Sequence, residues 1–290
     1  MRVARKRRRS GVKGFVALFL VACAVAHAAP VIDDAAIEEK FTAGLQQEGV
    51  DGMSGAAAAK ALAAARGMNT GVDRNKGEAV SNYEEACRSV VIIGSADNCP
   101  DCRKTHMGTV STGWVIDPRG RIMTNHHVLE DKEADELGVM TFDGRVFPVK
   151  AVLAADREGD AVILEIEPGG DALPALALAE SATTGEAIRV IGHPDGRFYS
   201  LSEGIVSRVF TDTLGEEKVR RTWLTVTADY GAGSSGAPVL NASGRVVGMV
   251  SSTAALLADT EEGKEPAAED VQMVFRDCVS VETMRRLIAD

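Results

Sequence analysis

The sequence predicts an all-β fold that ends in a helix. Residues 113–129 contain two apolar runs on either side of the turn sequence DPRG, and residues 161–166 (AVILEI) form an apolar run of strand length. Residues 238–250 show the same arrangement around NASGR, which predicts a β-hairpin. After the last strand, expected at 271–275, Ser280 can cap a helix whose apolar positions share one face, namely Val281, Met284, Leu287 and Ile288.

Residues 1–28 have the features of a secretory signal peptide. They contain seven Lys or Arg residues and no acidic residue, an apolar run at 14–22 that is too short to span a bilayer comfortably, and the cleavage pattern AHA at 26–28. We therefore expect a periplasmic or secreted protein. Cys23 ends the sequence LVAC, which resembles a bacterial lipobox, so a lipid anchor on Cys23 and an uncleaved signal anchor are the alternatives. Membrane attachment is expected only through such an anchor.

The charge balance excludes one class of partner. Removing the leader changes the formal charge of the chain from −10 to −17. Proteins that bind nucleic acids carry basic patches, so we expect no nucleic-acid partner.

The segment at residues 29–82 shows no pattern that indicates chemistry. It is rich in Ala and other helix formers at 29–40 and 54–66, and glycine-containing stretches at 49–52 and 67–75 interrupt these runs. We interpret it as a helical or disordered linker or pro-segment that packs on or tethers a folded domain at residues 83–290.

Ser235 is the candidate nucleophile. It lies in YGAGSSGAP at 230–238, with Gly233 two positions before it and Gly236 directly after it. Glycines allow the sharp turn and close ligand approach that an exposed serine nucleophile needs, with free backbone amides nearby for an oxyanion. An ordinary Gly/Ser-rich turn is the alternative interpretation of this stretch alone.

The partners that a serine nucleophile needs lie upstream. The second strand expected within 113–129 leads into His126 and His127, and Asp156 and Asp160 precede the strand expected at 161–166. A histidine with a near-neutral pKa can take the serine proton, and an aspartate can orient that histidine. The order His, Asp, Ser disfavours an α/β-hydrolase, in which the order is Ser, Asp, His.

The chain resembles the trypsin-like serine proteases, and most closely their bacterial Deg/HtrA branch. The motifs that carry the resemblance are TGWVIDPRGRIMTNHHV, GDAVILEI, IGHPDG with SEGIVSR, and GSSGAPVLNASGRVVGMVS, and the resemblance covers about residue 90 to the C-terminus. It implies two antiparallel six-stranded β-barrels followed by the helix. It also implies an endopeptidase of polypeptides that works through an acyl-enzyme without cofactor or metal, with a role in envelope protein quality control. Many Deg/HtrA proteins have a PDZ-like domain, and none is expected after the helix here.

The family pattern chooses between the paired candidates. It places the catalytic histidine directly before a valine, which is His127, and the orienting aspartate directly before the apolar strand, which is Asp160. His126 is then interpreted as a structural or surface histidine and Asp156 as a turn residue.

The same pattern implies the remaining machinery. Ser235 is the implied nucleophile, and the backbone amides of Gly233 and Ser235, with Ser234 between them, form the implied oxyanion hole. Ala237 stands where the family often has a second glycine, which indicates a slightly different turn. A catalytically inactive protease-like module that binds peptides is the alternative function, and the complete triad argues against it.

Substrate specificity has two interpretations. Asp229 lies six residues before Ser235, the offset at which trypsin-like enzymes that cleave after Lys or Arg carry the aspartate of their specificity pocket. Deg/HtrA-type enzymes prefer small aliphatic side chains instead, and Asp229 then braces the loop. The facing wall of the pocket is expected from Val250, Ser251 and Ser252.

Four cysteines follow the leader, and an even number in an exported protein suggests disulfides. The resembled fold brings the ends of the domain together, which implies a bond between Cys87 and Cys278. Cys99 and Cys102 in CPDC would form a small loop clip. A redox pair and half a zinc site with His106 are the alternatives for this motif.

Overall fold

The computed structural model describes residues 31–47, 52–65, 70–73, 75–215, 218–258, 267 and 270–289. The expected signal peptide, including Cys23, lies outside these residues. In the described part of the chain, no helix is both long enough and apolar enough to cross a membrane.

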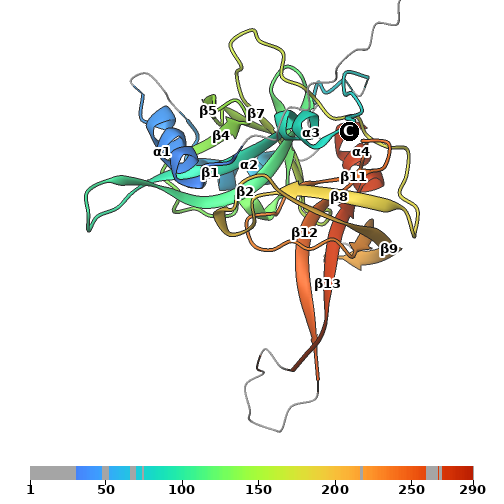
Figure 1. Ribbon diagram of the computed structural model, residues 1–290. Helices are drawn as coiled ribbons and strands as arrows, with labels where there is room; N and C mark the ends of the chain where they lie inside the picture. The colour runs from blue at the N-terminus through green and yellow to red at the C-terminus, as the bar shows by residue number, and fades with distance from the viewer. Residues whose placement is uncertain are drawn as a thin grey trace, which may run out of the picture. The chain divides into compact units, whose positions relative to one another are not determined.

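Two antiparallel β units form the body of the protein, as the sequence predicts (Figure 1). The first is a seven-stranded sheet in the order β5-β4-β1-β2-β3-β7-β6, and the second is a closed barrel in the order β10-β13-β12-β11-β8-β9. The sheet strands are β1 (Val90–Asn98), β2 (Thr105–Asp117), β3 (Arg121–Thr124), β4 (Leu137–Thr141), β5 (Val146–Pro148), β6 (Ala151–Asp156) and β7 (Ala161–Glu165). The barrel strands are β8 (Ala187–Gly192), β9 (Ser200–Leu214), β10 (Val219–Val226), β11 (Pro238–Asn241), β12 (Val246–Leu257) and β13 (Val271–Ser280).

The first unit therefore has one strand more than the six expected. The short strand β5 follows the turn at Asp143 and Gly144 and pairs with β4 at one edge of the sheet. The six-stranded barrel agrees with the expectation.

The helices are α1 (Asp34–Leu45), α2 (Gly55–Ala64), α3 (Tyr83–Ser89) and α4 (Val281–Ala289), with single 3₁₀ turns η1 (His127–Leu129) and η2 (Pro194–Gly196). The Ser280 hydroxyl accepts the Thr283 N–H at 3.3 Å, so it caps α4 as predicted. The four apolar positions predicted to share one face of α4 are all buried.

Helices α1 and α2 pack on the first sheet. Phe41 and Leu45 of α1 are buried, and a Cβ atom added to Gly138 of β4 would lie only 2.7 Å from the Leu45 side chain. Between the helices, the Met53 N–H donates to the Val149 carbonyl at 3.0 Å, and the Met53 carbonyl accepts the Leu137 N–H at 2.9 Å. Residues Ile32–Asp290 thus form one compact unit.

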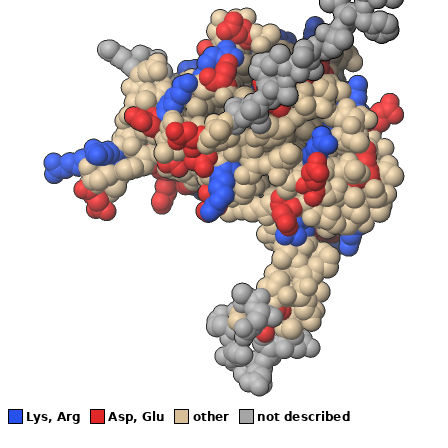
Figure 2. Space-filling view, viewed as in Figure 1, with Lys and Arg blue, Asp and Glu red and all other residues tan. Residues whose placement is uncertain are grey.

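Two hairpins extend beyond the sheet and the barrel (Figure 1). One is formed by β1 and β2, whose turn carries the CPDC motif. The other is formed by β12 and β13, which stay paired out to Leu257 and Val271. Its outer part exposes Leu256, Leu257 and Met273, and Figure 2 shows this ribbon as a largely uncharged projection.

Candidate active site

Three side chains from different parts of the chain meet where the sheet and the barrel join. His127 begins η1 just after β3, Asp160 directly precedes β7, and Ser235 lies in the loop between β10 and β11. His127 Nε2 is 3.0 Å from Ser235 Oγ, and His127 Nδ1 is 2.9 Å from Asp160 Oδ2. The three residues chosen from the sequence therefore lie within hydrogen-bond distance in a single chain of contacts.

Asp160 is held from several directions. Its backbone has φ = +47°, a left-handed conformation that is strained for a residue other than glycine. Its Oδ1 accepts the His127 backbone N–H at 3.1 Å, its Oδ2 accepts the Ser251 hydroxyl at 2.5 Å, and its carbonyl accepts the Asn125 side-chain amide at 2.9 Å. The first two bonds hold the carboxylate next to Nδ1, and the third holds the Asp160 backbone.

The Asp160 carboxylate sets the tautomer and the pKa of His127. Because an ionised carboxylate only accepts hydrogen bonds, the imidazole carries its proton on Nδ1, and Nε2 presents a lone pair to the Ser235 hydroxyl. Burial alone would lower the pKa of His127, but the hydrogen bond and charge of Asp160, helped by Glu130, raise that pKa above its ordinary value. The side chain is 43% exposed, so a substrate can reach it.

The loop that carries Ser235 needs glycine at two positions. Gly233 has φ = +90° and Gly236 has φ = +87°. A Cβ atom at Gly233 would lie 2.3 Å from the His193 carbonyl oxygen, and one at Gly236 would lie 2.0 Å from the Thr112 carbonyl oxygen. Thr112 also donates its N–H to the Ser235 carbonyl and its hydroxyl to the Gly233 carbonyl, at 2.9 and 2.8 Å.

Two backbone amides beside Ser235 are free to donate. Among the described residues, neither the Gly233 N–H nor the Ser235 N–H meets an acceptor, whereas the Ser234 N–H donates to the Gly231 carbonyl at 3.0 Å. Ser234 itself is buried. The amides expected to form the oxyanion hole are thus available, and Ser234 supports their turn.

The two competing residues have other contacts. His126 is buried, and its Nδ1 lies 3.1 Å from Glu130 Oε1. Asp156 pairs with Arg221 of β10 at 2.6 Å, with both side chains less than one-fifth exposed. His126 is structural, and Asp156 is more than a turn residue because it ties β6 to the barrel.

His193 also has a structural position. It is completely buried, its Nε2–H donates to the Val91 carbonyl at 3.2 Å, and its Nδ1 accepts the Tyr199 N–H at 3.0 Å. Burial lowers its pKa to about 4, so the imidazole is neutral and joins β1 to the loop beneath Gly233.

The four residues expected at the specificity pocket divide into separate roles. Asp229 is 85% exposed and pairs with Arg276 of β13 at 2.6 Å, which agrees with a brace for the loop. Val250 is buried, and its N–H and carbonyl bond the backbone of Ala237 and Gly236. Ser251 contacts Asp160 instead of facing a pocket, a role that its sequence position does not reveal. Ser252 is exposed at the start of the β12–β13 ribbon, and its carbonyl accepts the Tyr230 hydroxyl at 3.0 Å.

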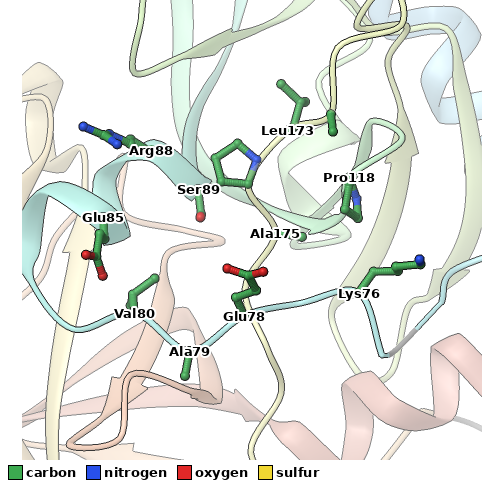
Figure 3. Close-up of a pocket in the computed structure, with 12 residues that line it drawn as sticks. Lys76, Glu78, Ala79, Val80, Glu85, Arg88, Ser89, Pro118, Leu173 and Ala175 are labelled. Atoms are coloured by element: carbon green, nitrogen blue, oxygen red, sulfur yellow. The ribbon is translucent and has the colours of Figure 1, made fainter.

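Hollows elsewhere on the surface do not involve the triad. The one in Figure 3 has a volume of about 410 Å³ and lies between the segment at 76–80, α3 and residues 172–175, with Glu78 and Ser89 facing it. A second hollow of about 610 Å³ lies between α2 and the buried His126.

The disulfides expected from the sequence are absent among the described cysteines, all four of which are free thiols. The bond expected between Cys87 and Cys278 is wrong. Cys87 lies in the short helix α3 and contacts Tyr83. Cys278 lies in the barrel core beside Tyr230, and burial raises the pKa of each thiol, to about 11 and about 12 respectively.

Comparison with known proteins agrees with this geometry. Residues 111–249 match the family model described as a trypsin-like peptidase domain, and this range includes His127, Asp160 and Ser235. Over these residues the chain is similar to trypsin-like peptidase domains. The domain is similar to a putative serine protease HhoA of Synechocystis sp. (32% identity, covering 51% of this chain and 38% of the relative).

Two further relatives show the same extent of similarity to the trypsin-like domain. One is a probable periplasmic serine endoprotease DegP-like of Halomonas elongata (34% identity, 49% of this chain and 29% of the relative). The other is a serine endoprotease DegS of Haemophilus influenzae (25% identity, 53% and 45%). In these three comparisons the matched region spans less than half the length of each curated relative.

Proposed function

We propose that the protein is an exported serine endopeptidase in which His127, Asp160 and Ser235 form the catalytic triad. The observation that supports this most directly is the continuous contact from the Asp160 carboxylate through the imidazole to the Ser235 hydroxyl, at 2.9 and 3.0 Å. The names of the relatives, which include periplasmic serine endoproteases, support the same activity and an envelope location. A role in envelope protein quality control follows as part of this proposal.

The reaction proceeds in two halves. Ser235 Oγ attacks the carbonyl carbon of the scissile peptide while its proton passes to His127 Nε2. The imidazolium then gives that proton to the amide nitrogen, the carbon–nitrogen bond breaks, and the amine leaves an ester on Ser235. A water molecule repeats the sequence: His127 takes its proton, its oxygen attacks the ester, and Ser235 recovers the proton as the carboxylic acid product departs.

Each neighbouring group has a defined part in those steps. The free Gly233 and Ser235 N–H groups donate hydrogen bonds to the substrate oxygen as negative charge develops on it, at about 3 kcal/mol of transition-state stabilisation per donor. Asp160 holds the tautomer and stabilises the imidazolium, and Ser251 holds Asp160.

We propose polypeptides as the substrates, with small aliphatic side chains favoured at the cleavage position. The ion pair between exposed Asp229 and Arg276 of β13 supports the bracing role of Asp229 over a pocket for basic side chains. A peptide panel tests this: efficient cleavage after Lys or Arg that is lost in Asp229→Asn would overturn it.

Activity-based labelling tests the function itself. A fluorophosphonate probe should label the wild-type protein on Ser235, and Ser235→Ala should be unlabelled and unable to hydrolyse casein. Peptide binding by a folded wild-type protein that is neither labelled nor hydrolytic would instead establish the inactive, peptide-binding alternative. Proteomic cleavage profiling of the same pair then gives the sequence preference.

A further inference from the structure

The turn of the β1–β2 hairpin gathers three metal-binding side chains outside the active site. Cys99 and Cys102 lie in the turn, and His106 lies near the start of β2. One ligand atom from each of the three residues lies within 4.8 Å of the others, and Cys102 Sγ is 2.9 Å from His106 Nε2. Among the described residues, this is the only group of three or more Cys, His, Asp or Glu side chains that comes so close together.

From this geometry we propose that Cys99, Cys102 and His106 bind a divalent metal ion of the zinc class. Bonds of about 2.3 Å from zinc to sulfur and about 2.0 Å to nitrogen give tetrahedral ligand–ligand edges of about 3.5–3.8 Å. The contact between Cys102 and His106 is shorter than such an edge, and every pair of ligand atoms lies within 4.8 Å, so small rotations of the side chains bring the atoms into place. Two thiolates and an imidazole are ligands that zinc prefers.

The backbone of the turn is arranged to support a thiolate. Backbone N–H groups of Cys102 and Asp101 hydrogen-bond to the Cys99 sulfur. Since a thiol must lose its proton to bind a metal, these bonds favour the form that coordinates. Arg103 and Lys104 add positive charge directly after the second cysteine, which also favours thiolates.

Hydrogen bonds within the protein hold the turn in place without a metal ion. The Cys99 N–H donates to the Lys104 carbonyl and its carbonyl accepts the Arg103 N–H, both at 2.9 Å. Asn98 bonds the Asp135 carboxylate through its backbone and side-chain amides at 2.8 and 3.1 Å. Such preformed ligand placement reduces the conformational entropy lost on binding.

Three protein ligands leave one position of a tetrahedral site for water or for a group from another molecule. The site lies on an exposed turn, and the strand β2 separates it from Thr112 at the nucleophile loop by six residues, about 20 Å of extended chain. Metal binding here is therefore independent of the proposed peptidase activity.

Cobalt titration of the thiol-reduced, full-length protein tests the proposal. Co²⁺ should bind in a 1:1 ratio with the near-ultraviolet charge-transfer absorption of two thiolates and the visible bands of a tetrahedral ion, and Zn²⁺ should displace it. Substitution of a residue that only hydrogen-bonds to a metal ligand weakens metal affinity about 10- to 100-fold. Cys102→Ser replaces a ligand itself, so it should weaken Co²⁺ affinity more than about 100-fold. His106→Asn should alter the visible bands and weaken binding.

His126→Asn is the matched control, because it removes an imidazole that lies away from the turn and should leave Co²⁺ affinity unchanged. The three ligand side chains are partly or fully exposed, so the variants should melt at the wild-type temperature without metal. The proposal is overturned if the reduced wild type binds neither ion at micromolar concentration, or if Cys102→Ser binds as tightly as wild type. It is also overturned if protein recovered from an oxidising compartment carries a Cys99–Cys102 disulfide and its reduction restores no binding.

Discussion

Replacement of Asp160 by asparagine separates catalysis from folding. Asparagine fits the same space and can still accept the His127 backbone N–H that Oδ1 now accepts at 3.1 Å. Its amide nitrogen then takes the place of Oδ2, which lies 2.9 Å from Nδ1. An amide N–H facing Nδ1 forces the imidazole proton onto Nε2, so His127 can no longer accept the proton of Ser235.

The expected loss of kcat/KM in Asp160→Asn has two causes, the removed negative charge and the wrong imidazole tautomer. Opposite unit charges about 4 Å apart attract by about 4 kcal/mol at the effective dielectric constant of a site near the surface, which corresponds to about 10³ in rate. The partial exposure of His127 reduces this amount, and the wrong tautomer adds to it. We therefore expect kcat/KM to fall by about 10³- to 10⁴-fold; the upper value is close to the loss of about 10⁴ in kcat known for the same change in a trypsin-like triad.

Asp156→Asn is the matched control, because Asp156 is the other aspartate just before β7. It leaves Arg221 largely buried without its partner, so it should lower the free energy of unfolding by about 3 kcal/mol. Its kcat/KM per folded molecule should stay within about threefold of wild type, because no atom of Asp156 bonds His127.

The assay combines peptide hydrolysis, the rate of fluorophosphonate labelling and thermal melting of the three proteins. Asp160→Asn should lose both activities at a near wild-type melting temperature, and Asp156→Asn should show the reverse. An Asp160→Asn variant that keeps more than one-tenth of wild-type kcat/KM would refute the assigned role, as would an Asp156→Asn variant that folds fully and is equally inactive.

Three further outcomes are expected. Gly236→Ala should lower the free energy of unfolding by at least about 2 kcal/mol in a denaturant titration, because the backbone φ of Gly236 is left-handed and the new Cβ would lie 2.0 Å from the Thr112 carbonyl oxygen. Gly231 has open space around its Cβ position and no positive φ, so Gly231→Ala should change the free energy of unfolding little. The pH profile of kcat/KM should rise through a midpoint above about 6.5, because neutral His127 is the active form and its pKa is raised; a midpoint below that value would contradict the role of Asp160. Phe41→Ala should lower the free energy of unfolding by about 3 to 5 kcal/mol in a single transition, since Phe41 is fully buried between α1 and the sheet; a separate early transition would instead make residues 32–82 an independent segment.

Much of the β architecture is predictable from the sequence because it is encoded locally. Apolar runs of strand length bounded by turn residues give β3, β7, β11 and the start of β12, and the residues next to them give His127, Asp160 and Ser235 their places. Each of the three proposed catalytic side chains lies next to the end of a strand or in a turn. Their order along the chain therefore predicts their meeting once the fold is known.

The structural features that cannot be predicted from the sequence depend on short local signals or on residues far apart in the chain. The helix α3 is seven residues long, too short for apolar periodicity, and its N-cap bond from Glu85 N–H to Asn82 is the one local signal that could have indicated it. Ser251 bonds Asp160 from 91 residues away, and Asp229 of the β10–β11 loop pairs with Arg276 of β13. No spacing in the sequence shows such contacts.

The cysteines show a further limit of sequence interpretation. Their even number in an exported chain suggests two bonds, but burial places Cys87 and Cys278 in different parts of the core. The sequence separation of two cysteines says little about whether their sulfurs meet, because a disulfide requires Cα atoms within about 7 Å.

The site depends on the joint between the sheet and the barrel as much as on the triad itself. The histidine and the aspartate come from the sheet, whereas the serine and the Ser251 hydroxyl that fixes Asp160 come from the barrel. Thr112 of β2 holds the nucleophile loop through two hydrogen bonds, and buried His193 bonds the Val91 carbonyl of β1. A shift of one unit by an ångström would therefore lengthen the contact between Nε2 and Oγ and displace the oxyanion amides together. Substitutions of Thr112 or His193, which bond across the joint beside the nucleophile loop, should therefore lower activity before they unfold either unit, unlike the more distant pair of Asp156 and Arg221.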